Sequence, residues 1–324
     1  MGAGGTVFVV GAARSGTTFV QTLLGAHPGV VTAQENDLFD QFVAPWRAAW
    51  EYQLPADAET WRRRRHKGLP AVLREEEFDA LLAGAIERVH AATRALKPEA
   101  SVLVDKTPGN VLHAELILRF LPDARFVHVV RDGRDVVCSL RRAGRGWGAE
   151  WASQALVDNA RAWRARVEAG HGIASLADAY REVRFERLAA GEGAAEELGR
   201  LFAFCGVEAT AAECARILAE HELGAEARSS LVWGGEVVAR LGGPPEEPEG
   251  FAGEGGVGAW RRELGARERL VVERYAGDLL RELGYAGDDW PGVAPLARGV
   301  ALGRLALERA RLRTGRALRG ALQQ

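Results

Sequence analysis

A glycine-rich segment near the start of the chain, Gly11 to Thr18, has the composition of an anion-binding loop. It lies between a short apolar run and a segment with apolar residues at helical spacing. A loop that leads from a strand into a helix points free backbone N–H groups, and the positive end of the helix dipole, at a bound anion. Glycine lets the backbone approach that anion closely. We therefore predict a phosphate-type site here, with Arg14 as its positive charge.

The loop differs from the nucleotide P-loop at one position. Its spacing is that of the motif G-x-x-x-x-G-K-S/T, but Thr17 stands where the motif has lysine. That lysine normally reaches the β- and γ-phosphates of a triphosphate, so its absence argues against ATP or GTP chemistry. The anion site itself is unaffected. A P-loop nucleotide kinase or NTPase is therefore an alternative function, and a plain glycine turn is an alternative structure.

Three further charged residues lie at or just beyond the ends of strand-like runs. Lys106 and Arg131 each end such a run, and Glu35 lies shortly after another. Open α/β sheets bind their ligands at the carboxyl ends of the strands, so these side chains are expected near the loop. The lysine is informative because all but three of the 42 basic residues are arginine. An ammonium group is a compact charge that can donate a proton.

The elements that must position these residues form an alternating pattern. Apolar runs of strand type are found at residues 7–10, 30–32, 102–104, 126–130 and 183–185. Segments of helical periodicity lie between them. This alternation predicts an α/β fold, with a P-loop-type parallel sheet flanked by helices on both faces. Residues 38–98 show mostly helical spacing, so we expect a helical insert there.

We expect one domain over residues 1–290 and a separate C-terminal helix over residues 291–324. A stretch at about 234–256 is rich in proline, glycine and glutamate, which predicts a mobile loop. Residues 296–322 form an amphipathic pattern with seven arginines and one acid. A basic helix of this kind either packs on its own domain or docks on a lipid surface, an acidic partner or another copy of the chain.

The composition narrows the class of protein. The chain has 324 residues and a formal charge of −2, so nothing in its overall charge calls for nucleic acid or an anionic membrane. No apolar run approaches the ~20 residues that span a bilayer. The cysteines Cys138, Cys205 and Cys214 form no metal-binding spacing and are typical of reduced core thiols. We expect a cytoplasmic protein without a metal.

Two segments together resemble the sulfotransferases that use 3′-phosphoadenosine 5′-phosphosulfate (PAPS). The loop, the helix after it and the pair His27-Pro28 look like the family's 5′-phosphosulfate-binding segment. The stretch FVHVVRDGRDVVCS, which begins at Phe126, is similar to its 3′-phosphate-binding segment. In that stretch Ser139 lies eight residues after Arg131, close to two helical turns. A guanidinium and a hydroxyl on one side suit a terminal phosphate.

Weaker matches extend the resemblance toward the C-terminus. The stretch from Val183 to Leu188 looks like the family's strand-and-acid segment, although Phe185 stands where relatives often have tyrosine. Trp260 and the residues after it look like the late tryptophan segment. Many relatives carry Arg-Lys-Gly before that tryptophan, whereas this chain reads Gly-Glu-Gly from Gly253. The pattern is nearer to the tyrosylprotein-type and bacterial small-molecule branches.

The resemblance implies a sulfotransferase with PAPS as its co-substrate and no metal. It implies that the nucleotide is bound by Arg14, Ser15, Gly16, Thr17, Thr18, Arg131 and Ser139. The sulfuryl group would move by in-line displacement to a hydroxyl acceptor, for which we expect a small natural product. A catalytically silent nucleotide-binding protein is a further alternative.

The resemblance also implies catalytic roles. It places a catalytic lysine at Lys106, in an Asp-Lys-x-Pro turn, where the ammonium would stabilise the leaving oxygen. Glu35 matches the catalytic glutamate of the tyrosylprotein branch, and we expect it to take the proton from the acceptor. His113 is a rival base, since other sulfotransferases use histidine, and Asp37 is a third candidate. The presence of both Lys106 and Glu35 argues against a silent protein.

Overall fold

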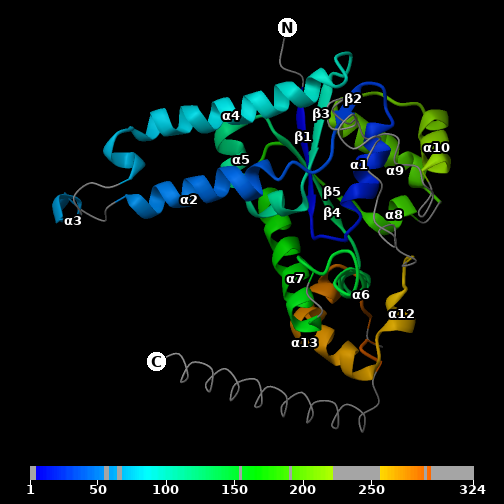
Figure 1. Cartoon of the computed structure of the whole chain (residues 1–324). Coiled ribbons are helices and arrows are strands. Elements are labelled where there is room, and N and C mark those ends of the chain that lie inside the picture. Colours follow the sequence, from blue (N-terminus) through cyan, green and yellow to red (C-terminus); the bar gives the residue numbers. More distant parts are fainter. Residues whose placement is uncertain are drawn as a thin grey trace, which may run out of the picture. The chain divides into compact units, whose positions relative to one another are not determined.

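The computed structural model describes residues 5–54, 58–63, 68–152, 155–189, 192–221, 256–287 and 290–292. Within them lies one five-stranded sheet, with the strand order β2-β3-β1-β4-β5 (Figure 1). The strands are β1 (Thr6–Gly11), β2 (Val30–Thr32), β3 (Val102–Lys106), β4 (Arg125–Val130) and β5 (Tyr180–Arg184). Every neighbouring pair is parallel, which confirms the predicted parallel sheet.

The chain divides into two compact units. The first unit comprises residues 1–131 and 166–252 and holds the whole sheet, whereas the second comprises residues 132–165 and 253–324. The single domain predicted over residues 1–290 stays a prediction. The loop predicted at about 234–256 lies outside the described residues except for its last residue. The helix predicted over residues 291–324, with its docking pattern at 296–322, lies outside them except for residues 291 and 292.

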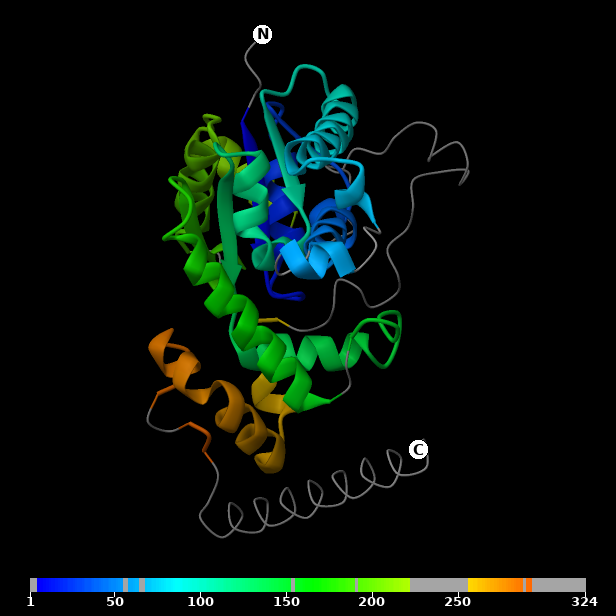
Figure 2. The same cartoon turned by 90° about the vertical axis from the view of Figure 1, so that its left-hand side faces the viewer.

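Strand β1 shows why both faces of the sheet are covered. Its side chains alternate between the two faces. Val7 and Val9 pack in one apolar cluster, and Phe8 and Val10 pack in another. Helices α1 (Thr17–Gly25), α9 (Ala194–Cys205) and α10 (Ala211–Glu220) contribute to the first cluster. Helices α2 (Ala44–Gln53), α4 (Glu75–Ala95) and α5 (Ala114–Phe120) contribute to the second. The prediction of helices on both faces is confirmed. Figure 1 shows the strands between the two layers, and Figure 2 looks onto the sheet from the side of α2 and α4.

The segment at residues 38–98 is mostly helical, as predicted. It comprises a π-helix η1 (Leu38–Val43), α2, α3 (Ala58–Arg63), a 3-10 turn η2 (Leu69–Ala71) and α4. Trp50 of α2 stacks on Phe78 of α4, with ring centroids 4.4 Å apart. Arg47 of α2 pairs with Glu75 and Asp79 of α4. Stacking and ion pairs thus join the two long helices of the insert.

One predicted strand is shifted by a few residues. The strand predicted at 183–185 is β5, which begins at Tyr180 and ends at Arg184, and a short helix α8 (Phe185–Ala189) follows it. Between β3 and β4 lies a 3-10 turn η3 (Pro108–Leu112), which is followed by α5. Towards the end of the described residues lie two helices, α12 (Trp260–Glu263) and α13 (Ala266–Glu282). They are separated at Gly265, whose N–H donates to Glu268.

The second unit is held together by residues of the RDGRD motif. Within α6 (Gly133–Ala143), the guanidinium of Arg134 pairs with Asp132 and lies over the rings of Trp260 and Trp290, at 3.9 and 4.8 Å. The carboxylate of Asp135 accepts hydrogen bonds from the backbone N–H groups of Gly258, at 2.7 Å, and of Trp260, at 2.9 Å. These charges of the motif therefore have structural partners.

No helix in the described part of the chain is long and apolar enough to cross a membrane.

Candidate active site

The predicted phosphate loop connects β1 to α1. Three of its residues have positive φ: Gly11 at 153°, Arg14 at 70° and Gly16 at 98°. A Cβ placed on Gly16 would lie 2.2 Å from a ring carbon of Phe185. Position 16 therefore requires glycine for two reasons, its backbone angle and the aromatic ring beside it. Phe185, which opens α8, closes one side of the loop.

The loop offers hydrogen-bond donors that the described protein groups do not use. Ser15 is 1% exposed, and its Oγ has no hydrogen-bond partner among the described residues. Helix α1 begins at Thr17 without a side-chain cap at Gly16. The N–H groups in the first turn of a helix have no partner within that helix. A buried unpaired hydroxyl is costly, so a bound anion at this point would satisfy it. The donor set fits a phosphate or sulfate group.

The two predicted catalytic residues are in direct contact. Lys106 is the last residue of β3, and its Nζ donates hydrogen bonds to Oε1 of Glu35 and, at 3.2 Å, to Oγ1 of Thr18. The lysine side chain is 2% exposed, whereas that of Glu35 is 40% exposed. β2 and β3 are parallel neighbours, and β3 also pairs with β1, Lys106 lying opposite Val9. The sheet thus brings Lys106 and Glu35 to the N-terminus of α1.

Asp105 fixes the loop that carries Glu35, a role the sequence analysis missed. It is buried on β3, and its carboxylate accepts hydrogen bonds from the side-chain amides of Asn36, at 2.8 Å, and Asn110, at 3.2 Å. Oδ1 of Asn36 in turn accepts from the N–H of Leu38, at 2.9 Å. Burial raises the pKa of Asp105 to about 6. The position of Asn36, directly after Glu35, was the available signal.

His90 is the buried histidine next to Asp105. Nε2 of His90, on α4, lies 3.9 Å from Oδ2 of Asp105. Burial, together with the smaller effect of the nearby charge of Arg94, lowers the pKa of His90 to about 4. Near neutral pH the imidazole is therefore uncharged.

Arg131 reaches the phosphate loop from β4. It directly follows that strand and is 7% exposed. Its Nη1 donates to the backbone oxygen of Arg14, at 3.3 Å, and its guanidinium lies over the ring of Phe185, at 4.3 Å. Ser139 is buried on α6, in the second unit. The Arg131–Ser139 phosphate clamp stays a prediction.

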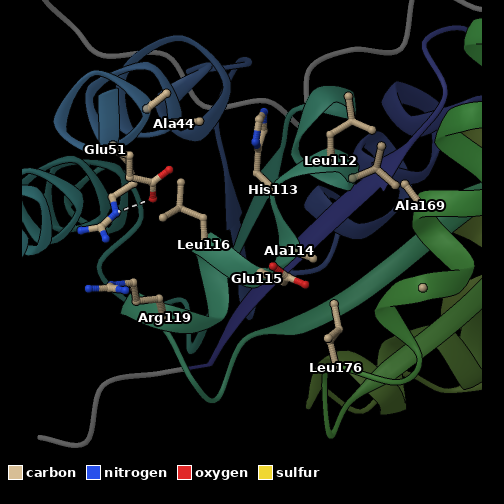
Figure 3. Close-up of a pocket in the computed structure, with 14 residues that line it drawn as sticks. Ala44, Glu51, Leu112, His113, Ala114, Glu115, Leu116, Arg119, Ala169 and Leu176 are labelled. Carbon is tan, nitrogen blue, oxygen red and sulfur yellow. Dashed lines mark hydrogen bonds and ion pairs between the residues drawn. The ribbon is translucent and has the colours of Figure 1, made fainter. Parts of the chain in front are cut away.

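The two other candidate bases have different surroundings. Nε2 of His113 lies 2.8 Å from Oδ1 of Asp40. His113 also lines a pocket of about 660 Å³ between α2, α5 and α7 (Leu156–Ile173) (Figure 3). Residues Glu35 and Lys106 are not among the lining residues of this pocket. Asp37 has a φ of 49°, and its pKa is raised by burial and by the charges of Glu35 and Asp40. Glu35 is thus the candidate base that contacts Lys106.

A parallel sheet with a glycine-rich loop between β1 and α1, and with a lysine at the end of the adjacent strand, is the arrangement with which α/β proteins bind anionic ligands at the carboxyl edge of the sheet. The sequence model of the sulfotransferase family matches residues 6–211, well over half of the chain. The chain therefore belongs to the sulfotransferase family. The matched region holds the sheet, the phosphate loop, Glu35, Lys106 and Arg131.

Known proteins that resemble the chain include tyrosylprotein enzymes. A protein-tyrosine sulfotransferase of Drosophila melanogaster is 28% identical over 134 residues, which are 41% of this chain and 24% of that protein. Protein-tyrosine sulfotransferase 2 of Gallus gallus is 29% identical over 134 residues, 41% of this chain and 33% of that protein. The chain spans less than half the length of the curated relatives it matches.

A solved structure shares the fold. A mouse sulfotransferase in complex with PAP has a TM-score of 0.51 and 12% identity, covering 87% of this chain and 89% of that one.

Proposed function

We propose that this protein transfers a sulfuryl group from PAPS to a hydroxyl acceptor. The observation that carries the proposal is the contact of Lys106 with both Glu35 and Thr18, at the N-terminus of α1. It joins an anion-binding loop, a buried cation and a partly exposed carboxylate. Membership of the sulfotransferase family supports the reaction. The mouse protein of the same fold, solved with PAP, supports the nucleotide.

The residues present fit the nucleotide. In this proposal Arg14, Ser15, Gly16, Thr17 and Thr18 hold the 5′-phosphosulfate, and the unpaired Oγ of Ser15 supplies one donor. The 3′-phosphate would be held by Arg131 and Ser139. When bound, PAPS supplies the sulfuryl group and a phosphate as the leaving group. Arg131 already contacts the backbone of the loop, so it would link binding of the 5′-phosphosulfate to binding of the 3′-phosphate.

Lys106 and Glu35 have separate roles in the proposed reaction. The ammonium of Lys106 donates to the oxygen on which negative charge develops. Glu35 accepts the proton of the acceptor hydroxyl as that oxygen attacks sulfur in line. Among the described residues Glu35 makes one side-chain hydrogen bond, through Oε1 to Lys106. The ion pair therefore orients the carboxylate and leaves Oε2 for the acceptor.

The acceptor that we propose is a small molecule, a natural-product alcohol or phenol. A second candidate is a tyrosine side chain of a peptide, which the matched protein-tyrosine sulfotransferases favour. Both acceptors present a hydroxyl to Glu35, so the same site would serve either. They differ in the surroundings that the hydroxyl needs, which the helical insert at 38–98 would supply.

Binding and turnover test the proposal together. Adenosine 3′,5′-bisphosphate should raise the melting temperature far more than ATP with magnesium, because a ligand that binds the native state stabilises it. An equal shift, or a shift with ATP alone, would favour a P-loop kinase or NTPase instead. Radiolabelled PAPS should then label simple phenols, alkyl alcohols or a tyrosine peptide. Nucleotide binding without any transfer would indicate a silent nucleotide-binding protein.

A further inference from the structure

Three metal-ligand side chains meet in the first unit, among residues that the proposed reaction does not use. They are His128 on β4, His171 on α7 and Glu182 on β5. One ligand atom from each lies within 4.8 Å of the other two. The residues are far apart in sequence, so they match no metal motif, and only the parallel pairing of β4 with β5 brings two of them together.

The buried histidine of the cluster has the form of a metal ligand. His128 is completely buried, and its Nδ1 lies 2.9 Å from the hydroxyl of Tyr180. Its Nε2 is buried and has no hydrogen-bond partner among the described residues. Metal-bound histidines generally donate their second ring N–H to an oxygen, which fixes the ring and keeps the lone pair on the other nitrogen. In the tautomer of His128 that donates Nδ1–H to Tyr180, the free lone pair is on Nε2.

The backbone leaves room for this ring. A Cβ placed on Gly170, the residue before His171, would lie 2.2 Å from the His128 ring. A side chain at position 170 would therefore displace the imidazole. Glycine lets α7 approach β4 closely enough for the two histidine rings to lie 5.7 Å apart.

The other two side chains of the cluster are partly exposed and contact each other. Nε2 of His171 lies 2.9 Å from Oε2 of Glu182, and the two side chains are 34% and 26% exposed. Oε1 of Glu182 accepts from Nε of Arg184, at 2.7 Å. Ligating carboxylates are commonly held by such an outer hydrogen bond. His171 and Glu182 are therefore the solvent-accessible members of the cluster.

We propose that His128, His171 and Glu182 bind one divalent transition-metal ion of the zinc type. Two imidazoles and a carboxylate are a known zinc ligand set, with water as the fourth ligand. Ligands at ~2.1 Å from one tetrahedral ion lie roughly 3.4 Å apart, so ligand atoms now separated by up to 4.8 Å must draw in by up to about 1.4 Å. Rotation of the partly exposed His171 and Glu182 can supply this movement. The ion would join β4, β5 and α7 and would take no part in the transfer reaction.

Metal titration of the full chain tests the site without reference to activity. Chelator-treated protein should bind one equivalent of zinc by calorimetry, and cobalt(II) should give the visible absorption of a tetrahedral site. His171→Ala and Glu182→Gln should each weaken zinc binding by ~10²-fold or more, since each removes a direct ligand. Both side chains are partly exposed, so both variants are expected to fold, which circular dichroism checks.

A matched control is available in the same unit. His113→Asn removes another histidine–carboxylate pair, with Asp40 at 2.8 Å, that has no third ligand in the described residues. It should leave zinc affinity and stoichiometry unchanged. The proposal is overturned if the wild-type protein binds no zinc at tenfold excess. It is equally overturned if folded His171→Ala and Glu182→Gln bind as the wild type does, or if cobalt shows the charge-transfer band of a thiolate ligand.

Discussion

The ammonium of Lys106 donates a hydrogen bond to the carboxylate of Glu35, across 71 positions of sequence. The lysine ends β3, and the glutamate follows β2, which is its parallel neighbour. The contact places a buried cation between a partly exposed carboxylate and Thr18, in the first turn of α1. A cation in that place can serve an anionic leaving group on one side and orient a base on the other. The predictions about the reaction follow from this arrangement.

Lys106→Ala should lower kcat by ~10²-fold or more, the scale of losing one preorganised charge stabiliser. The affinity for adenosine 3′,5′-bisphosphate should change less, because the charge matters most when the leaving oxygen becomes anionic. Steady-state kinetics and a nucleotide titration measure the two effects separately. If kcat is retained and only nucleotide affinity falls, Lys106 is a ground-state ligand.

Glu35→Gln should bind the bisphosphate normally and lose ~10²–10⁴-fold in kcat, as expected when a general base is removed. Glutamine keeps the size of the side chain and an oxygen for Lys106. The defect should shrink for acidic phenols, which arrive partly deprotonated, and persist for alkyl alcohols. His113→Asn is the matched variant, because it removes the rival base. Near-normal turnover of an alkyl alcohol by Glu35→Gln would reject the assignment.

Arg131→Ala should erase the preference of the protein for adenosine 3′,5′-bisphosphate over AMP. The guanidinium is the proposed ligand of the 3′-phosphate, and its contact with the backbone of Arg14 ties it to the loop. Calorimetry with both nucleotides measures the preference. Arg131→Lys keeps a charge but not the fork, so it should retain only part of the preference. A variant that still distinguishes the nucleotides as the wild type does would assign the 3′-phosphate to other residues.

How much the sequence could predict depended on whether the signal was local. The apolar run of β1 is buried on both faces, so a short β-branched run was enough to identify it. β5 lies at the edge of the sheet, and only Val183 of its residues is fully buried. Its weak apolar pattern explains why the predicted strand was shifted.

The same difference between local and long-range signals applies to the candidate active site. The loop from Gly11 to Thr18 is contiguous, so its spacing could be read directly. The ends of parallel strands meet at one edge, which allowed Lys106 and Glu35 to be expected near each other. Asp105 was missed because its role arises from two amides, Asn36 and Asn110, that approach it only in the folded chain. The cluster of His128 with His171 and Glu182 was missed for the same reason.

Gly16→Ala should destabilise the protein by ~1–3 kcal/mol and weaken nucleotide binding. Its φ of 98° is unfavourable for alanine, and the added Cβ would collide with Phe185. Gly84→Ala is the control, since Gly84 lies in α4 with nothing within 4 Å of the new Cβ. Alanine there should stabilise the helix by ~0.5–1 kcal/mol. Denaturant unfolding measures both, and equal stability of the two variants would mean that the loop is not constrained as described.

Asp105→Asn should change the pH dependence of stability. Burial raises the pKa of Asp105 from 3.8 to about 6, although Asn36 and Lys106 favour its charged form. The native state therefore holds its proton more tightly than the unfolded chain, so the contribution of Asp105 to stability is present below pH 3.8 and is lost as the pH rises through 6. Asparagine does not titrate, so the variant does not lose this stability as the pH rises. Relative to wild type, the free energy of unfolding of the variant should increase by roughly 2 kcal/mol between pH 4 and 6.

His90 provides the control of opposite sign for the Asp105 prediction. Burial lowers the pKa of His90 from 6.5 to about 4, so its contribution to stability is present above pH 6.5 and is lost as the pH falls through 4. His90→Asn should therefore lose stability relative to wild type as the pH rises over this window, whereas Asp105→Asn gains it. Urea unfolding at half-unit steps of pH measures both differences. Parallel curves for wild type and Asp105→Asn would show that folding does not raise the pKa of Asp105.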